Sequence, residues 1–235
     1  MPDTQLVDQL RVLMAVALAG LLLLLRLDAP RFSAAEYDTD QTDDSLTGIA
    51  TRLAWPALAV VIVAGIAALL PAGRSAVGLG AGTIVSPATI LWAILGSALG
   101  VGAVFGLARM REPIWPPRLR PRGRIPRLAV DAIGTAVVDE LTFRGVVLGL
   151  LLLAGLAPAE AFLVQLLLYG LETRLGRSTK TLDLLAETLA LGFVTGLLAL
   201  LTGGVVAPLV AHAVTRFAAL DVAAGLPPIL PRRFA

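Results

Sequence analysis

The chain has 235 residues, of which 57% are hydrophobic and only 15% charged, and its formal net charge is +2. Soluble domains carry about 25% charged residues, so this composition predicts a membrane protein and excludes a soluble globular domain. No cysteine is present, which excludes disulfides, thiolate zinc sites and cysteine nucleophiles.

Seven apolar segments follow one another along the chain, and each is long enough to cross a bilayer as a helix. They lie at about residues 10–27, 53–71, 88–108, 128–154, 158–174, 185–202 and 204–221. We therefore expect an all-α protein, a polytopic transmembrane helical bundle of about seven spans in the cell membrane.

The first apolar segment has two interpretations. Its uninterrupted apolar run, Val12 to Leu25, is short, and a cleaved signal peptide has a run of similar length. However, Asp3 and Asp8 precede it, whereas a signal peptide begins with a positive region. Arg26, at its other end, can lengthen the span by placing its charge in the membrane interface. We therefore expect a retained transmembrane helix.

The third apolar segment carries no charge and is rich in glycine. Small residues at these spacings let neighbouring membrane helices approach closely. We interpret them as packing positions in the bundle; they are Gly96, Gly100, Gly102 and Gly106.

The distribution of cations predicts the orientation. If the seven spans alternate, 15 of the 19 Lys and Arg residues lie on one side, in residues 26–52, 109–127, 174–180 and 232–233. Positive loops stay in the cytoplasm, so we expect the N-terminus outside and the C-terminus in the cytoplasm. Because the cations report orientation, we expect the lipid bilayer as a partner and no nucleic acid.

Two polar segments, an acidic loop at 28–45 and an arginine-rich, proline-rich loop at 109–127, organise the chain. We expect three parts. Residues 1–127 form N-terminal transmembrane helices with both loops, and residues 128–221 form a core of four helices that bears the candidate site. Residues 222–235 form a short cytoplasmic tail.

The fourth span contains charges where the bilayer makes them costly, at about 2.5–3.5 kcal/mol each on insertion scales. Asp139 lies about 17 Å into the span at 1.5 Å per residue. Glu140 and Arg144 are four residues apart and share a helix face, which predicts an ion pair. Asp139 points about 100° away from Glu140 and is free to face a cavity. A buried structural ion pair is the alternative to a catalytic role.

The only histidine, His212, lies in the last span. A lone histidine often only joins two helices, but with a carboxylate it can also polarise a water and move its proton. A metal site has little support because one histidine without cysteine leaves only carboxylates as further ligands. We expect no cofactor, although a metal is not excluded. Glu172 and Asp131 lie near span ends, so we expect them at the membrane interface.

Residues 139–145 resemble a known family. Their sequence is similar to the Glu-Glu-x-x-x-Arg signature of the CAAX protease and bacteriocin-processing (abortive-infection type) family of intramembrane peptidases. The family's second motif, an aromatic residue followed four positions later by histidine, falls at Tyr169 and Thr173. Its third motif, a histidine with Asn or Asp four residues later, falls at His212 and Arg216.

The resemblance covers about residues 128–220. It implies an intramembrane endopeptidase that hydrolyses a peptide bond of a membrane-associated peptide or protein. Water would be activated by the Asp139 and Glu140 pair with His212. The supporting residues would be Arg144, Tyr169, Thr173 and Arg216.

Three departures from the family pattern keep other functions open. Asp139 replaces a glutamate, Thr173 replaces a histidine and Arg216 replaces an asparagine, although a guanidinium also stabilises an oxyanion. The alternative is a catalytically impaired member that acts as a membrane binding or immunity-type protein. A small transporter would also explain charges within spans, but the sequence shows neither an inverted repeat nor paired broken helices.

Overall fold

The computed structural model describes residues 4–32, 46–70, 73–80, 86–111, 125–175 and 182–225, and within these ranges all regular structure is helical. Most of the two predicted polar loops, and the tail from residue 226, lie outside the described residues. The all-α prediction is therefore confirmed for the part of the chain that the structure describes.

Long helices coincide with all seven predicted segments. Six are α1 (Thr4–Leu27), α2 (Leu46–Leu69), α4 (Pro87–Arg111), α7 (Pro158–Leu175), α8 (Leu182–Thr202) and α9 (Val206–Gly225). The fourth segment is one helix of three parts, namely α5 (Ile125–Asp139), the π-helical segment η4 (Glu140–Val147) and α6 (Leu148–Leu153). Two short 3-10 helices, η1 (Ala29–Phe32) and η2 (Gly73–Val77), follow α1 and α2.

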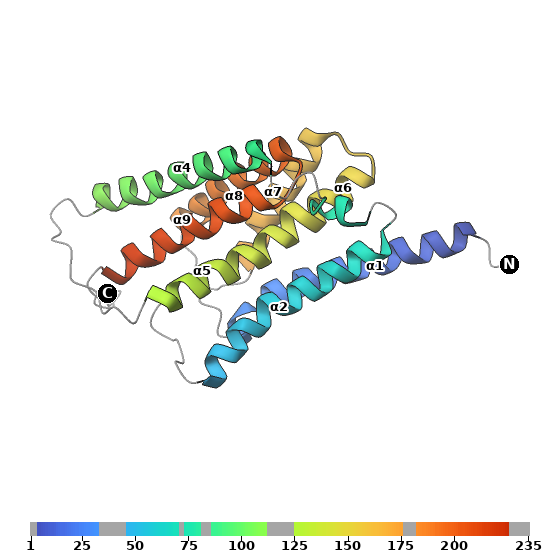
Figure 1. Cartoon of the computed structure of the whole chain (residues 1–235), viewed down its shortest axis with the longest axis horizontal. Coiled ribbons are helices and arrows are strands. Elements are labelled where there is room, and N and C mark those ends of the chain that lie inside the picture. The colour runs from blue at the N-terminus through green and yellow to red at the C-terminus, as the bar shows by residue number, and fades with distance from the viewer. Residues whose placement is uncertain are drawn as a thin grey trace.

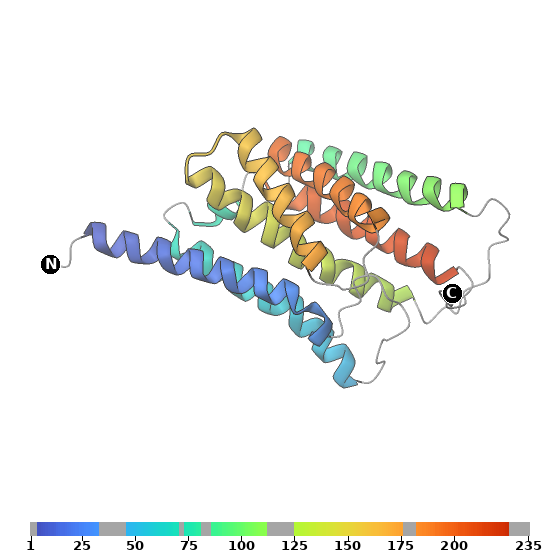
Figure 2. The same cartoon turned by 180° about the vertical axis from the view of Figure 1, so that it is seen from behind.

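The helices run along one axis in alternating directions, so that α1 begins at one end of the molecule and α9 finishes at the opposite end (Figure 1). The helices α1 and α2 lie side by side at one edge in both views (Figures 1 and 2). α2 also packs on α5, α5 on α9, and α9 on α4, which joins this edge to the rest of the bundle.

The outer surface is apolar. Four of the described helices are long and apolar enough to cross a membrane, over Gln5–Leu27, Ile49–Leu69, Pro87–Leu107 and Leu185–Thr202. Large side chains on their outer faces are exposed, for example Leu13 and Val61, as is Leu167 of α7 at 69%. Such surfaces mark contact with lipid or with another apolar surface. Crossing by all seven helices, and the orientation, stay predictions.

Two arginines that the sequence analysis counted among the cations of one membrane side, Arg26 and Arg52, are buried. Arg52 in α2 has an Nη1 atom 3.8 Å from Oδ1 of Asp131 in α5. Asp131 is therefore buried and paired rather than interfacial. Arg26, in the last turn of α1, is only 3% exposed. The sequence analysis counted charges along the chain, whereas helix packing provides these arginines with carboxylate partners.

The glycines of α4 have two different environments. A methyl group added at Gly100 would lie 1.8 Å from Oγ1 of Thr215 in α9, and one at Gly96 would lie 2.7 Å from Leu198 in α8. At Gly102 and Gly106 such a group would meet nothing within 4 Å. Close helix packing thus explains two of the four positions.

These environments predict different effects of the same substitution. We expect Gly100→Ala to lower the free energy of unfolding by about 1–3 kcal/mol, because Thr215 is short and β-branched and must shift with its backbone. The matched Gly102→Ala variant should lose no stability, because its methyl group meets open space. Thermal unfolding of both proteins in detergent, followed by tryptophan fluorescence, measures the difference. Equal midpoints would contradict the α4–α9 packing.

Candidate active site

The π-helical segment η4 carries the centre of the candidate site. All eight of its residues are buried. The backbone of η2 lies against this part of the helix, since a methyl group at Gly149 would be 1.9 Å from the carbonyl oxygen of Ala76, and one at Gly145 would be 3.1 Å from that of Val77. Glycine is therefore required for this approach. π-helical turns within α-helices occur frequently at functional sites.

Each carboxylate oxygen of Glu140 lies close to a different partner. Its Oε1 atom lies 2.7 Å from Nδ1 of His212 in α9. Its Oε2 atom lies 3.3 Å from Nε of Arg144, one turn further along the same helix. The predicted ion pair of Glu140 and Arg144 is thus present, and His212 is a partner of the same carboxylate.

Asp139 is buried and has hydrogen-bond donors from two other helices. The Nε atom of Arg26 donates a hydrogen bond to its Oδ1, and Nη2 of Arg26 lies 3.4 Å from its Oδ2. The hydroxyl of Tyr169 in α7 also donates to Oδ2, at 3.2 Å. Nε2 of His212 lies 4.0 Å from the same oxygen. A helix from the N-terminal half of the chain therefore completes the surroundings of this carboxylate.

Aromatic rings and a backbone carbonyl hold Arg144 in place. Its guanidinium carbon lies 4.5 Å from the ring centre of Tyr169, and its Nη2 donates to the carbonyl oxygen of Gly192 at 3.0 Å. The Tyr169 ring meets Phe143 edge to face at 4.9 Å. Cation–π contact stabilises a desolvated guanidinium. Arg144 therefore joins η4 to α7 and α8.

The structure brings together five of the seven site residues predicted from the sequence: Asp139, Glu140, Arg144, Tyr169 and His212. Arg216 is buried on α9, one turn after His212. Thr173 lies in the last two turns of α7, and its side chain is outside the described part of the structure.

Two residues in this cluster were missed or misplaced by the sequence analysis. The sequence analysis let Arg26 place its charge in the membrane interface and expected Glu172 at that interface as well. Glu172 is in fact buried in the last turn of α7, and its Oε2 atom lies 3.9 Å from Nε of Arg26. The signal that could have identified Arg26 is a charge count, because the two adjacent acids Asp139 and Glu140 have only one arginine, Arg144, one turn along the same helix.

The cluster has the elements needed to move a proton. A buried charge in an apolar bundle must be paired, and here carboxylates, guanidinium groups and an imidazole alternate across four helices. Both ring nitrogens of His212 are directed toward carboxylate oxygens, one in hydrogen-bond contact and one at 4.0 Å. Such a gap suits a bridging water. Among the described residues, no group of three or more acidic or histidine side chains is arranged to hold a metal ion.

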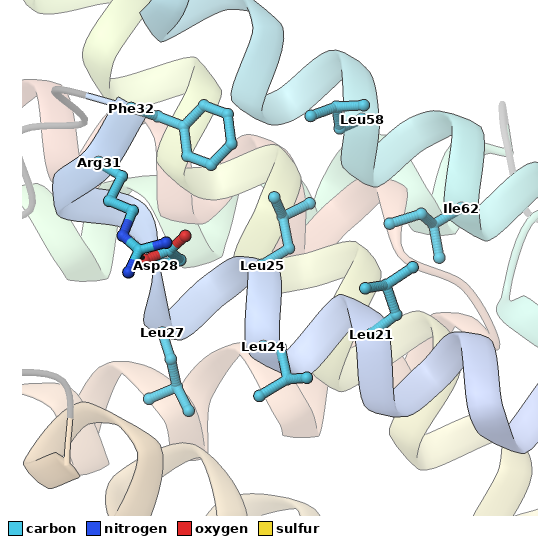
Figure 3. A pocket seen from close by; sticks show the side chains of 9 residues that line it. All are labelled: Leu21, Leu24, Leu25, Leu27, Asp28, Arg31, Phe32, Leu58 and Ile62. Carbon is cyan, nitrogen blue, oxygen red and sulfur yellow. Dashed lines mark ion pairs between the residues drawn. The ribbon is translucent and has the colours of Figure 1, made fainter.

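A separate groove lies between the end of α1, η1 and α2 (Figure 3). Its volume is about 520 Å³, and its walls are mainly the side chains of Leu21, Leu24, Leu58 and Ile62. The ion pair of Asp28 and Arg31, at 3.0 Å, stands at its polar end. No residue of the charged cluster lines this groove, so it is not the candidate active site.

One family model matches a part of the chain that includes the site residues predicted from the sequence. Residues 121–218, less than half of the chain, match a family model described as type II CAAX prenyl endopeptidase Rce1-like. The match includes η4, α7 and α8 and confirms the family resemblance that the motifs predicted. It leaves α1, α2 and α4 outside. No curated protein and no solved structure matches the chain.

The buried pair predicts a large effect of removing one charge. We expect Arg144→Met to lower the free energy of unfolding by about 3–5 kcal/mol, because it leaves the Glu140 carboxylate buried without its guanidinium. Exposed Arg74 on η2 provides the control, and Arg74→Met should have little effect. Detergent unfolding curves measure both. The double variant Glu140→Gln/Arg144→Met should recover part of the loss, and failure to do so would argue against a coupled pair.

Proposed function

We propose that this chain, whose residues 121–218 match the family model described as type II CAAX prenyl endopeptidase Rce1-like, is an intramembrane endopeptidase. It hydrolyses a peptide bond of a membrane-associated peptide or protein. The match to a protease family favours an enzyme over the non-catalytic binding protein. The apolar exterior of the helices supports a site within the membrane.

One observation carries the proposal: His212 lies between two carboxylates of η4 and α5. Glu140 accepts from Nδ1 at 2.7 Å and so leaves Nε2 as the nitrogen able to take a proton. Nε2 lies 4.0 Å from Oδ2 of Asp139. A water between these two atoms would be within hydrogen-bond reach of both, where the imidazole acts as a general base.

The reaction then follows from these positions. The oxygen of the water attacks the carbonyl carbon of the scissile peptide, and its proton passes to Nε2 of His212. Glu140 orients the ring and stabilises the imidazolium that forms. The imidazolium next donates the proton to the leaving nitrogen as the C–N bond breaks. Arg216, buried one turn further along α9, is the candidate donor to the oxyanion. This route requires no metal ion.

Cleavage should depend on all three groups of this arrangement. We expect Asp139→Asn, Glu140→Gln and His212→Ala each to lower the rate by about 10²–10⁴-fold, the usual contribution of a positioned acid or base. The assay uses the full chain in lipid nanodiscs and a library of membrane-anchored peptides, with cleavage followed by mass spectrometry. Chelators should not inhibit.

The exposed acid Glu160 on α7 gives a matched control, and Glu160→Gln should cleave at the wild-type rate. Wild-type cleavage that survives both Glu140→Gln and His212→Ala would refute the assignment of the site. A folded wild-type protein that cuts no member of the library would contradict the proposal that the chain is an endopeptidase.

The proposal also includes seven crossings of the cell membrane, with the N-terminus outside and the C-terminus in the cytoplasm. The alternating helix directions support it. The absence of cysteine allows a direct test with single cysteines. We expect Arg74→Cys to react with an impermeant maleimide in intact cells, and Arg118→Cys to react only after permeabilisation. The opposite pattern would reverse the orientation.

A further inference from the structure

We propose that Arg26 is a positioning residue of this site, which holds the Asp139 carboxylate with one oxygen turned toward His212. Arg26 lies on α1, outside the segment that matches the family model. The role in catalysis rests on the proposed function. The contact itself is tested independently below.

The contacts of Asp139 determine the orientation of its carboxylate. Arg26 donates to Oδ1 from one side, and Tyr169 donates to Oδ2 from α7. Donors from two different helices leave the carboxylate little freedom to rotate. Oδ2 is thereby kept at 4.0 Å from Nε2 of His212. Removal of Arg26 would release Oδ1 and allow the carboxylate plane to turn.

The position of Arg26 on α1 is unusual for an arginine at a helix end. Such a side chain can reach the membrane interface with little cost, and Arg26 is one residue from the last residue of α1. It turns inward instead and is buried. A guanidinium that turns inward loses its hydration, and specific partners must compensate for this loss. Asp139 and Glu172 are the partners of Arg26.

The packing of α1 directs the Arg26 side chain into the bundle. Ala15, Ala19 and Leu22 are buried at a spacing that continues to Arg26, so one stripe of α1 faces the bundle. Leu24, which lines the groove, lies about 160° away around the helix at 100° per residue. Trp55 of α2 fastens the end of α1, because its Nε1 donates to the carbonyl oxygen of Leu25 at 2.9 Å.

A purely structural ion pair is the competing explanation. The NMR signals of the His212 ring distinguish it from a positioning role. Because the chain has one histidine, isotope labelling of histidine gives ring signals that need no assignment, provided that the purification tag contains none. If Arg26 sets the place of the Asp139 oxygen, the surroundings of the ring change when Arg26 is lost. A merely structural role leaves the ring signals unchanged.

The experiment compares wild type, Arg26→Gln, Arg26→Lys and the control Arg31→Gln by NMR of the labelled full chain in nanodiscs. Arg31 is an exposed neighbour with a local partner, Asp28. We expect the His212 signals to shift in Arg26→Gln, to return toward the wild-type position in Arg26→Lys and to stay unchanged in Arg31→Gln. Should Arg26→Gln fail to fold, the smaller shift that remains in Arg26→Lys, whose ammonium is shorter than the guanidinium, is compared with wild type and with Arg31→Gln instead.

The same proteins are then assayed for cleavage of the peptide that wild type cuts best. We expect Arg26→Gln to lower kcat by about 100-fold with little change in KM, as for misplacement of a reacting group. Unchanged His212 signals in a folded Arg26→Gln protein would overturn the positioning role. If wild type cuts no peptide but the His212 signals still shift in Arg26→Gln, the peptidase function is refuted and the contact between Arg26 and Asp139 is retained.

Discussion

The arrangement of this bundle depends on the neutralisation of charges that lie within apolar helices. Asp139 and Glu140 are adjacent and fully buried, and an unpaired carboxylate in such a place is strongly destabilising. Each therefore needs donors, and the fourth helix itself supplies only Arg144. The remaining donors come from α1, α7 and α9, so the requirement for pairing draws four separate helices to one point.

This requirement explains why small residues occur where they do. Helices can bring polar groups together only if their backbones approach closely. Gly192 of α8 faces the ring of Tyr169, with 2.7 Å to a methyl group placed there, and its carbonyl oxygen accepts a hydrogen bond from Arg144. Gly145 and Gly149 similarly admit the backbone of η2 beside η4. Close packing and charge pairing are thus two aspects of one arrangement.

The buried acids and their partners contribute both to the stability of the bundle and to the proposed chemistry. The groups that neutralise the acids also restrict their motion, so a site that moves protons does not have to be organised again for each reaction. α1 is of special interest here, because it lies outside the family-matched segment and yet contacts Asp139. In this chain at least one N-terminal helix does more than pack at the edge of the bundle, since Arg26 of α1 donates a hydrogen bond to Asp139.

The sequence by itself determined the class of protein, the positions of the seven helices, and the pair of Glu140 and Arg144. Composition and apolar length are properties of the chain, and a contact at four residues follows from helix geometry alone. The partnership of His212 with Glu140 was anticipated only in outline, through chemistry and resemblance. The glycines of α4 were recognised as packing positions. The sequence did not show that only Gly96 and Gly100 of the four pack closely against other helices.

Only the tertiary structure decided the rest. Arg26 and Asp139 are 113 residues apart, and no local period relates them, so the sequence analysis did not pair them. Glu172 was misplaced for the same reason, because closeness to a span end does not reveal which neighbour covers it. The π-helical turn at η4 was also unforeseen. These features arise from how helices pack, which a pattern along one helix does not contain.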